Sequence, residues 1–177
     1  NTALGAGAFI SNTTGDFNVA IGPFTLDAAT TADSNTGVGY AVLTSNTTGA
    51  NNTGLGRDAL AANTTGADNT AIGHDSLDAN TTGDQNTAVG ALSLDANTTG
   101  SFNTAIGRAS LFSNTTANHN IAVGYNSLLS NTTGANNIAM GSLALDANTT
   151  TSDNTSIGYA SLSTQNGGNG RNTALGS

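Results

Sequence analysis

The sequence consists of one unit that recurs every 17 residues along the chain. Numbering its positions from the first asparagine gives the consensus N-T-A-(I/V/L)-G-x-x-(S/A)-L-x-(A/S)-N-T-T-G-x-x. The asparagines that head the units are Asn1, Asn18, Asn35, Asn52, Asn69, Asn86, Asn103, Asn120, Asn137 and Asn154. Asn172 follows after 18 residues, so the tenth unit carries one extra residue, within the segment 165–170. Such repetition indicates a solenoid, because units this short bury apolar side chains only by stacking on one another.

Short β-segments fit this unit better than helices. The unit is too short for two helices and two turns, and its glycine and threonines oppose helix formation. The N-T-A-I-G stretch is typical of a short strand, x-S-L-x-A is predicted to form a second strand, and N-T-T-G has turn chemistry. The sequence therefore predicts one all-β domain over residues 1–177, a parallel β-roll of ten coils about 4.8 Å apart and roughly 50 Å long.

Four positions of the unit are expected to define its interior. Position four is aliphatic or methionine and position nine is leucine or phenylalanine, so we expect both to be buried. In the central coils this predicted core comprises Ile72, Val89, Ile106, Leu77, Leu94 and Leu111. The invariant glycine at position five predicts a corner with positive φ, or a close backbone approach with no room for Cβ. Asparagine at position one is expected to form a ladder of amide hydrogen bonds along the axis.

Two large apolar side chains per coil make a thin core for seventeen ordered residues. We therefore expect several rolls to associate side by side, and three rolls wrapped around one axis would suit a fibre. Small residues at position three would then allow close contact between rolls; the first five are Ala3, Ala20, Gly37, Gly54 and Ala71.

Composition excludes several classes of partner. Only 8% of the residues are charged and the net charge is −8, which opposes binding to nucleic acid, because phosphates require clustered cations. The chain has no cysteine, hence no disulfide or thiol chemistry. No apolar run approaches the roughly 20 residues of a membrane span, so we expect no membrane insertion. Because the chain starts in phase with its repeat, we expect a fragment of a longer fibre protein.

The stretches N-T-A-I-G at 69–73 and 103–107, and N-V-A-I-G at 18–22, resemble the repeat of YadA-like trimeric autotransporter heads. The longer unit N-T-A-I-G-x-x-S-L-x-x-N-T-T-G is similar to repeats of bacteriophage tail fibres. The resemblance covers all ten coils and implies a left-handed parallel β-roll with three chains side by side. The head repeats are shorter than this unit, so the additional N-T-T-G segment is expected to form a larger turn.

Residues suited to metal binding or catalysis are few. Asp78 and Asp95 occupy position ten of adjacent coils and are weak calcium candidates, against the alternative of solvated carboxylates. His74 and His119 occupy different positions, and without cysteine or glutamate they assemble neither a zinc site nor a hydrolytic triad. We therefore expect no enzyme activity and no cofactor. The N-x-T sequons at position twelve are interpreted as turn chemistry, because glycans on adjacent coils would collide.

Positions six and seventeen vary in chemistry from coil to coil. They supply aromatic and cationic side chains, which are common at binding hot spots. The candidate surface-contact residues are Tyr40, Arg57, His74, Phe102, Arg108, His119, Tyr125 and Tyr159. The alternative is that these positions are solvent-facing and unconstrained.

The leading hypothesis is a non-enzymatic, extracellular fibre module, from a phage tail fibre or a bacterial surface adhesin. It would be a rigid homotrimeric spacer at the cell surface or on a virion fibre, with contact to a host glycan or surface protein. The alternative is an ice-binding solenoid that uses the threonine rows beginning at Thr13 and Thr14.

Overall fold

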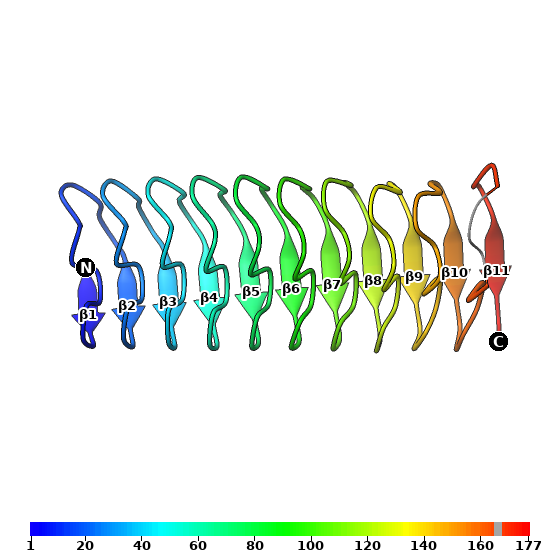
Figure 1. Ribbon diagram of the computed structural model, residues 1–177, viewed down its shortest axis with the longest axis horizontal. Coiled ribbons are helices and arrows are strands. Elements are labelled where there is room, and N and C mark those ends of the chain that lie inside the picture. Colours follow the sequence, from blue (N-terminus) through cyan, green and yellow to red (C-terminus); the bar gives the residue numbers. More distant parts are fainter. Residues whose placement is uncertain (165–167) are drawn as a thin grey trace.

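The computed structural model describes residues 1–164 and 168–177, so residues 165–167 of the irregular tenth unit lie outside it. Its coils follow one another in a straight row with the two ends of the chain at opposite ends (Figure 1). Each coil contributes one short strand. The strands are β1 (Thr2–Leu4), β2 (Val19–Ile21), β3 (Thr36–Val38), β4 (Thr53–Leu55), β5 (Thr70–Ile72), β6 (Thr87–Val89), β7 (Thr104–Ile106), β8 (Ile121–Val123), β9 (Ile138–Met140), β10 (Thr155–Ile157) and β11 (Thr173–Leu175).

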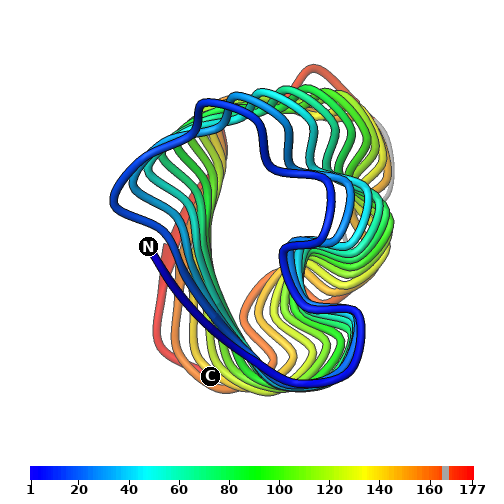
Figure 2. The same ribbon diagram turned by 90° about the vertical axis from the view of Figure 1, so that its left-hand side faces the viewer.

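All eleven strands form one parallel sheet in sequence order. Equal positions of successive units pair with each other, as Thr70 with Thr87 and Ile72 with Val89. The same register continues through the longer tenth unit, where Thr155 pairs with Thr173. Viewed along the axis, the coils superpose around one common outline (Figure 2). The predicted all-β parallel solenoid with 17-residue coils is therefore confirmed.

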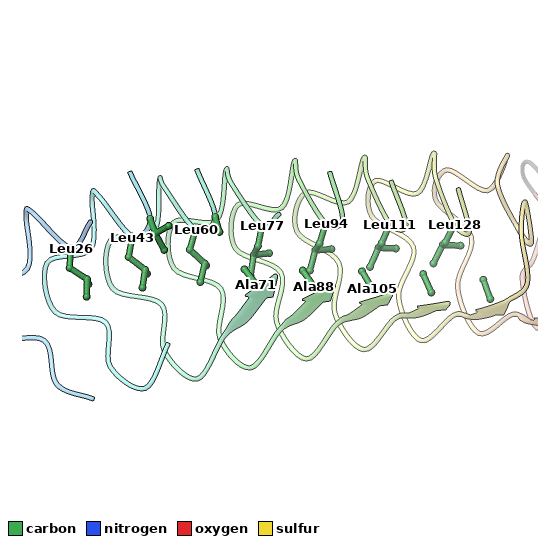
Figure 3. Packing of buried hydrophobic residues seen from close by; sticks show 14 of the residues in the cluster. Leu26, Leu43, Leu60, Ala71, Leu77, Ala88, Leu94, Ala105, Leu111 and Leu128 are labelled. Atoms are coloured by element: carbon green, nitrogen blue, oxygen red, sulfur yellow. The ribbon is translucent and has the colours of Figure 1, made fainter. Parts of the chain in front are cut away.

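The leucines of position nine form the core. Leu77, Leu94 and Leu111 are completely buried and stand one above another, as predicted. Alanines at position three of the unit, such as Ala88 in the middle of β6, lie opposite this leucine row and are also fully buried (Figure 3). The interior of each coil is thus one leucine wide, and the residue that faces this leucine from the strand must be small.

The prediction that position four is buried is wrong for this chain. Ile72, Val89 and Ile106 do stack through the strand register, but Ile72 is 36% and Ile106 41% exposed, and Val89 is only half-buried. Successive side chains of a strand point to opposite faces. Once position three faces the leucine row, position four must therefore point outward.

The expected role of position three is corrected by the same alternation. Ala20, Gly37, Gly54 and Ala71 are buried inside their own coils and cannot provide a contact between rolls. Only Ala3, in the first coil, is exposed. The outer surface of the sheet belongs to positions two and four instead.

The predicted second strand is absent from the described residues, although the backbone there is still hydrogen-bonded from coil to coil. The Leu77 N–H donates to the Ser93 carbonyl at 2.9 Å and the Ala79 N–H to the Asp95 carbonyl at 3.0 Å. Positions seven and nine are left-handed, with φ of 53° at Asp75 and 54° at Leu77. These alternating left-handed residues turn the chain too sharply for a strand, so the segment forms a stacked turn.

The glycine of position five meets both predictions made for it. Gly90 has a φ of 133°, and a Cβ placed on it would lie 2.6 Å from the carbonyl oxygen of Gly107 in the next coil. The invariant glycine therefore allows both the corner and the close spacing of coils.

Candidate interaction surface

Two ladders of asparagine side chains run through the interior of the rod. At position one, the Asn86 backbone N–H donates to Oδ1 of Asn69 at 2.9 Å, and its Nδ2 donates to the Gly100 carbonyl at 2.8 Å. This confirms the predicted ladder. At position twelve, Asn80 Nδ2 donates to Oδ1 of Asn63 at 2.8 Å and to the Gly83 carbonyl at 3.0 Å. Both rows are buried from coil to coil and tie adjacent coils together.

The second ladder was missed by the sequence interpretation, which assigned position twelve to turn chemistry. The available signal was that this position is nearly as constant as position one: among the first nine units only the second, with Ala29, departs from asparagine. The position-twelve sequons from Asn46 to Asn148 consequently carry buried, hydrogen-bonded amides. In contrast, the sequon asparagine Asn51, at position seventeen, is exposed.

The outward side chains of β1–β11, at positions two and four, form a surface that we call the strand face. Position two carries threonine in eight strands, and Val19, Ile121 and Ile138 in the others. Position four carries an unbroken apolar row. Its most exposed members inside the rod are Leu55 at 47% and Met140 at 42%. The strand face contains no charged residue, so a long, uncharged, largely apolar strip lies along the rod.

Positions six and seventeen border the strand face on its two sides and are called the border rows. Between them the chain alternates, with positions one and three buried and positions two and four outward. All eight candidate surface-contact residues lie in the border rows and are exposed, as expected of contact residues. The structure divides them into two groups: Phe102 and His119 on the position-seventeen side, and the other six on the position-six side.

Within a border row, side chains of adjacent coils contact one another. The rings of Phe102 and His119 stack at 4.9 Å with an angle of 8° between their planes. The Arg108 guanidinium lies 5.8 Å from the centroid of the Tyr125 ring, within the range of a cation–π contact. Arg57 and His74 also contact each other, and the His74 imidazole lies 3.2 Å from the carboxylate of Asp75. The border rows are thus partly ordered along the axis.

The carboxylates of Asp78 and Asp95 lie half-buried on adjacent coils. Desolvation, followed by the charges of Asp78 and Asp75, raises the pKa of Asp95 to about 6. Desolvation, followed by the charges of Asp75 and Asp58, also raises the pKa of Asp78. In the described ranges no three potential His, Cys, Asp or Glu ligands converge as a metal site would require.

The two threonine rows of the turn differ in their hydroxyl groups. Position-thirteen hydroxyls donate to the carbonyl one coil further on, as Thr64 Oγ1 does to Thr81 at 2.9 Å. Position-fourteen threonines such as Thr65 are exposed. The outer threonine array is therefore a single row on a turn, bordered by a row whose hydroxyl hydrogens are already engaged.

Comparison with protein-family models, curated proteins and solved structures gives no match. Within residues 1–164 and 168–177 there is no pocket. Nor does any helix in those ranges have the length and apolarity to cross a membrane. The surface that the geometry offers for function is therefore the strand face with its border rows.

Proposed function

We propose that this chain is a non-catalytic, extracellular fibre module: a rigid spacer, of the kind found in phage tail fibres or bacterial surface adhesins. It acts as three left-handed rolls packed side by side. The observation that carries the proposal is the continuous strand face, an uncharged and largely apolar strip along a straight stack of coils.

Rigidity is supported by bonding that recurs in every regular coil. Each junction between coils contains the strand pairing, backbone bonds around the turns and amide bonds from the asparagine ladders. Bending the rod would stretch the hydrogen bonds on one side of several junctions at once, and each buried bond that is lost leaves a polar group unsatisfied. Such a stack holds whatever is attached to its ends at a fixed distance.

Side-by-side association is supported by the exposed position-four row. Monomeric soluble proteins rarely expose a contiguous apolar patch of more than a few hundred Å². Ten spacings of about 4.8 Å make this strip roughly 48 Å long. An uncharged face with the same repeat from end to end is complementary to copies of itself, and three such faces can surround one axis.

Sedimentation equilibrium of the purified chain tests this proposal. A mass three times that of the chain is expected, and small-angle X-ray scattering should show an elongated particle. A stable monomer at micromolar concentration would refute the side-by-side assembly. A glycan array and a pull-down on intact cells test the receptor contact, and a spacer should give no signal in either.

A second candidate function, ice binding, is favoured by one observation. Eight threonines of position two lie beside the apolar row on the strand face, and those of adjacent strands pair in register, as Thr36 with Thr53 and Thr70 with Thr87. The turn threonines of positions thirteen and fourteen are not on a sheet. Ice binding requires this face to be free in solution. Thermal hysteresis of a monomeric chain would support this function, whereas a trimer without hysteresis would exclude it.

A further inference from the structure

The irregular tenth unit contains a dipeptide that the regular units lack. Although the chain is rich in asparagine, only Asn166 and Asn169 are followed by glycine, and both belong to this unit. Asn166 lies outside the described residues, so the structure bears on Asn169 alone. The side chain of Asn169 is exposed, and Gly170 follows it with a φ of 69°.

The side-chain amide of an asparagine can react with the backbone nitrogen of the next residue. That nitrogen forms a bond to Cγ, the bond from Cγ to the amide nitrogen breaks, and ammonia leaves from a succinimide ring. Water then opens the ring at either carbonyl and gives aspartate or isoaspartate. The reaction depends on bringing two groups of one chain into contact, and glycine favours it because no Cβ obstructs the approach.

The regular coils oppose this reaction even at exposed asparagines. Asn118 is exposed, but its Oδ1 accepts a hydrogen bond from the Ser101 N–H at 2.7 Å, and the N–H of the following His119 donates to the Ser101 carbonyl at 3.2 Å. Asn51 is also exposed, and the N–H of Asn52 donates to the position-one asparagine of the preceding coil at 2.9 Å. Attack by either nitrogen would first break a hydrogen bond between coils.

Asn169 and Gly170 lack both of these restraints. Within residues 1–164 and 168–177, no hydrogen bond engages the Asn169 amide or the Gly170 N–H. The next hydrogen bond along the chain is made by Arg171, whose N–H donates to the Ser152 carbonyl of the ninth coil at 3.1 Å. The attacking nitrogen and the amide that it attacks can therefore approach each other without unfolding a regular coil.

We propose that Asn169 is a self-modification site, at which the Gly170 nitrogen converts the amide to aspartate and isoaspartate without an enzyme. Isoaspartate lengthens the main chain by one atom at a point of close contact, because a Cβ on Gly170 would lie 2.1 Å from the Ser152 carbonyl oxygen. The added atom displaces the Arg171 N–H from Ser152 and loosens β11 from β10. With time the tenth unit thus weakens one junction while the regular coils stay intact, whatever the assembly of the rod.

Peptide mass spectrometry of the full chain, incubated in mildly alkaline buffer, tests the modification. The Asn166→Ser background leaves one natural Asn-Gly pair, and fragmentation of the peptide distinguishes isoaspartate from aspartate at Asn169. Conversion should speed up with pH, because the Gly170 nitrogen attacks after losing its proton. His119→Gly is the matched control: it places glycine after Asn118 in a regular coil, at a φ of 59° that glycine tolerates. Asn118 should then convert at least about tenfold more slowly than Asn169.

Hydrogen–deuterium exchange of fresh and aged protein tests the consequence for the fold. Residues 168–177 should exchange faster after ageing, while the regular coils keep their protection. Asn169→Asp carries the new charge without the extra main-chain atom and should exchange like the fresh protein. A persistent amide at Asn169, or equally fast conversion of Asn118 in the control, would refute the site. Conversion that leaves the exchange of 168–177 unchanged would refute the loosening of β11.

Discussion

At the scale of the residue, the fold depends on which side of a three-residue strand each side chain occupies. Leucine at position nine fills the interior from the turn side, and the residue facing it at position three is small: alanine, glycine or, at Ser156, serine. The larger aliphatic of position four is left outside because a strand alternates its faces. Size and hydrophobicity alone therefore do not identify the core of a coil this narrow.

Leu77→Ala and Ile72→Ala make a matched pair within one coil. Leu77 is fully buried, so its truncation leaves a cavity and should lower the free energy of unfolding by about 2–5 kcal/mol. Ile72 is partly exposed, so its truncation should lower the free energy of unfolding clearly less under conditions where the chain is monomeric. Urea denaturation followed by circular dichroism measures both, and equal losses would contradict the assigned sides.

Two substitutions at positions with positive φ make a second matched pair, and they should change the free energy of unfolding in opposite directions. Gly90→Ala forces a methyl group toward the Gly107 carbonyl at a φ of 133° and should cost about 2–5 kcal/mol. Ala41→Gly replaces a left-handed alanine, at a φ of 53°, with the residue that tolerates it best. It should stabilise by up to about 1 kcal/mol after the entropy of glycine is deducted. Thermal unfolding distinguishes them, and destabilisation by Ala41→Gly would argue against the left-handed turn.

At the scale of the element, the asparagine ladders connect one coil to the next. The second coil interrupts the position-twelve ladder with Ala29, and there position fifteen is Ala32 where most coils have glycine. In the third coil a Cβ on Gly49 would lie 2.3 Å from the carbonyl oxygen of Gly66 and 2.4 Å from Oδ1 of Asn46, so the next coil and the ladder both favour glycine here.

Ala29→Asn combined with Ala32→Gly should therefore repair the ladder. The new amide would lie between Asn12 and Asn46, and the restored hydrogen bonds should raise the free energy of unfolding by about 1–2 kcal/mol. Denaturant titration of the two single variants and the double variant measures the coupling. The double variant should gain more stability than the sum of the changes in the two single variants, and additive changes would argue against the coupling.

The raised pKa of Asp95, about 6, makes stability depend on pH. The folded state binds this proton more tightly than the unfolded state, whose aspartate pKa is about 3.9. The free energy of unfolding should therefore rise as the pH falls from 7 through 6 toward 4, and this gain should be smaller in Asp95→Asn, where only the raised pKa of Asp78 still contributes to it. Asp78→Asn should shift the rise to lower pH, because the Asp78 charge helps to raise the pKa of Asp95. Denaturation at several pH values checks both variants.

The sequence alone predicted the coil length, the parallel stacking, the leucine core, the glycine corner and the first asparagine ladder, because each depends on one position repeated in every unit. The sides of the strand and the left-handed turn were not predictable in this way. Both depend on how the two halves of a coil share one narrow interior. Leucine and aspartate at left-handed φ, as in Leu77 and Asp75, give no local signal of that conformation.

At the scale of the whole molecule, the stacking of coils aligns the outward side chains of successive strands into one continuous surface. One apolar side chain outside each strand becomes a strip along the full rod, and variable positions on both sides become the border rows. The candidate contact residues were identified from their variability. Their place beside the strand face was not predicted, because the sequence interpretation put position four inside the coil and position three outside it. The fibre proposal depends on that placement.

Paired charge substitutions in the seventh coil test the sides of the strand most directly, with circular dichroism and sedimentation equilibrium measured on each variant. Ile106→Asp places the carboxylate on the strand face, so the coil should stay folded while the assembly dissociates toward the monomer. Leu111→Asp places it in the fully buried row and should disrupt the fold. Unfolding by Ile106→Asp, together with a folded and undiminished assembly in Leu111→Asp, would contradict the account.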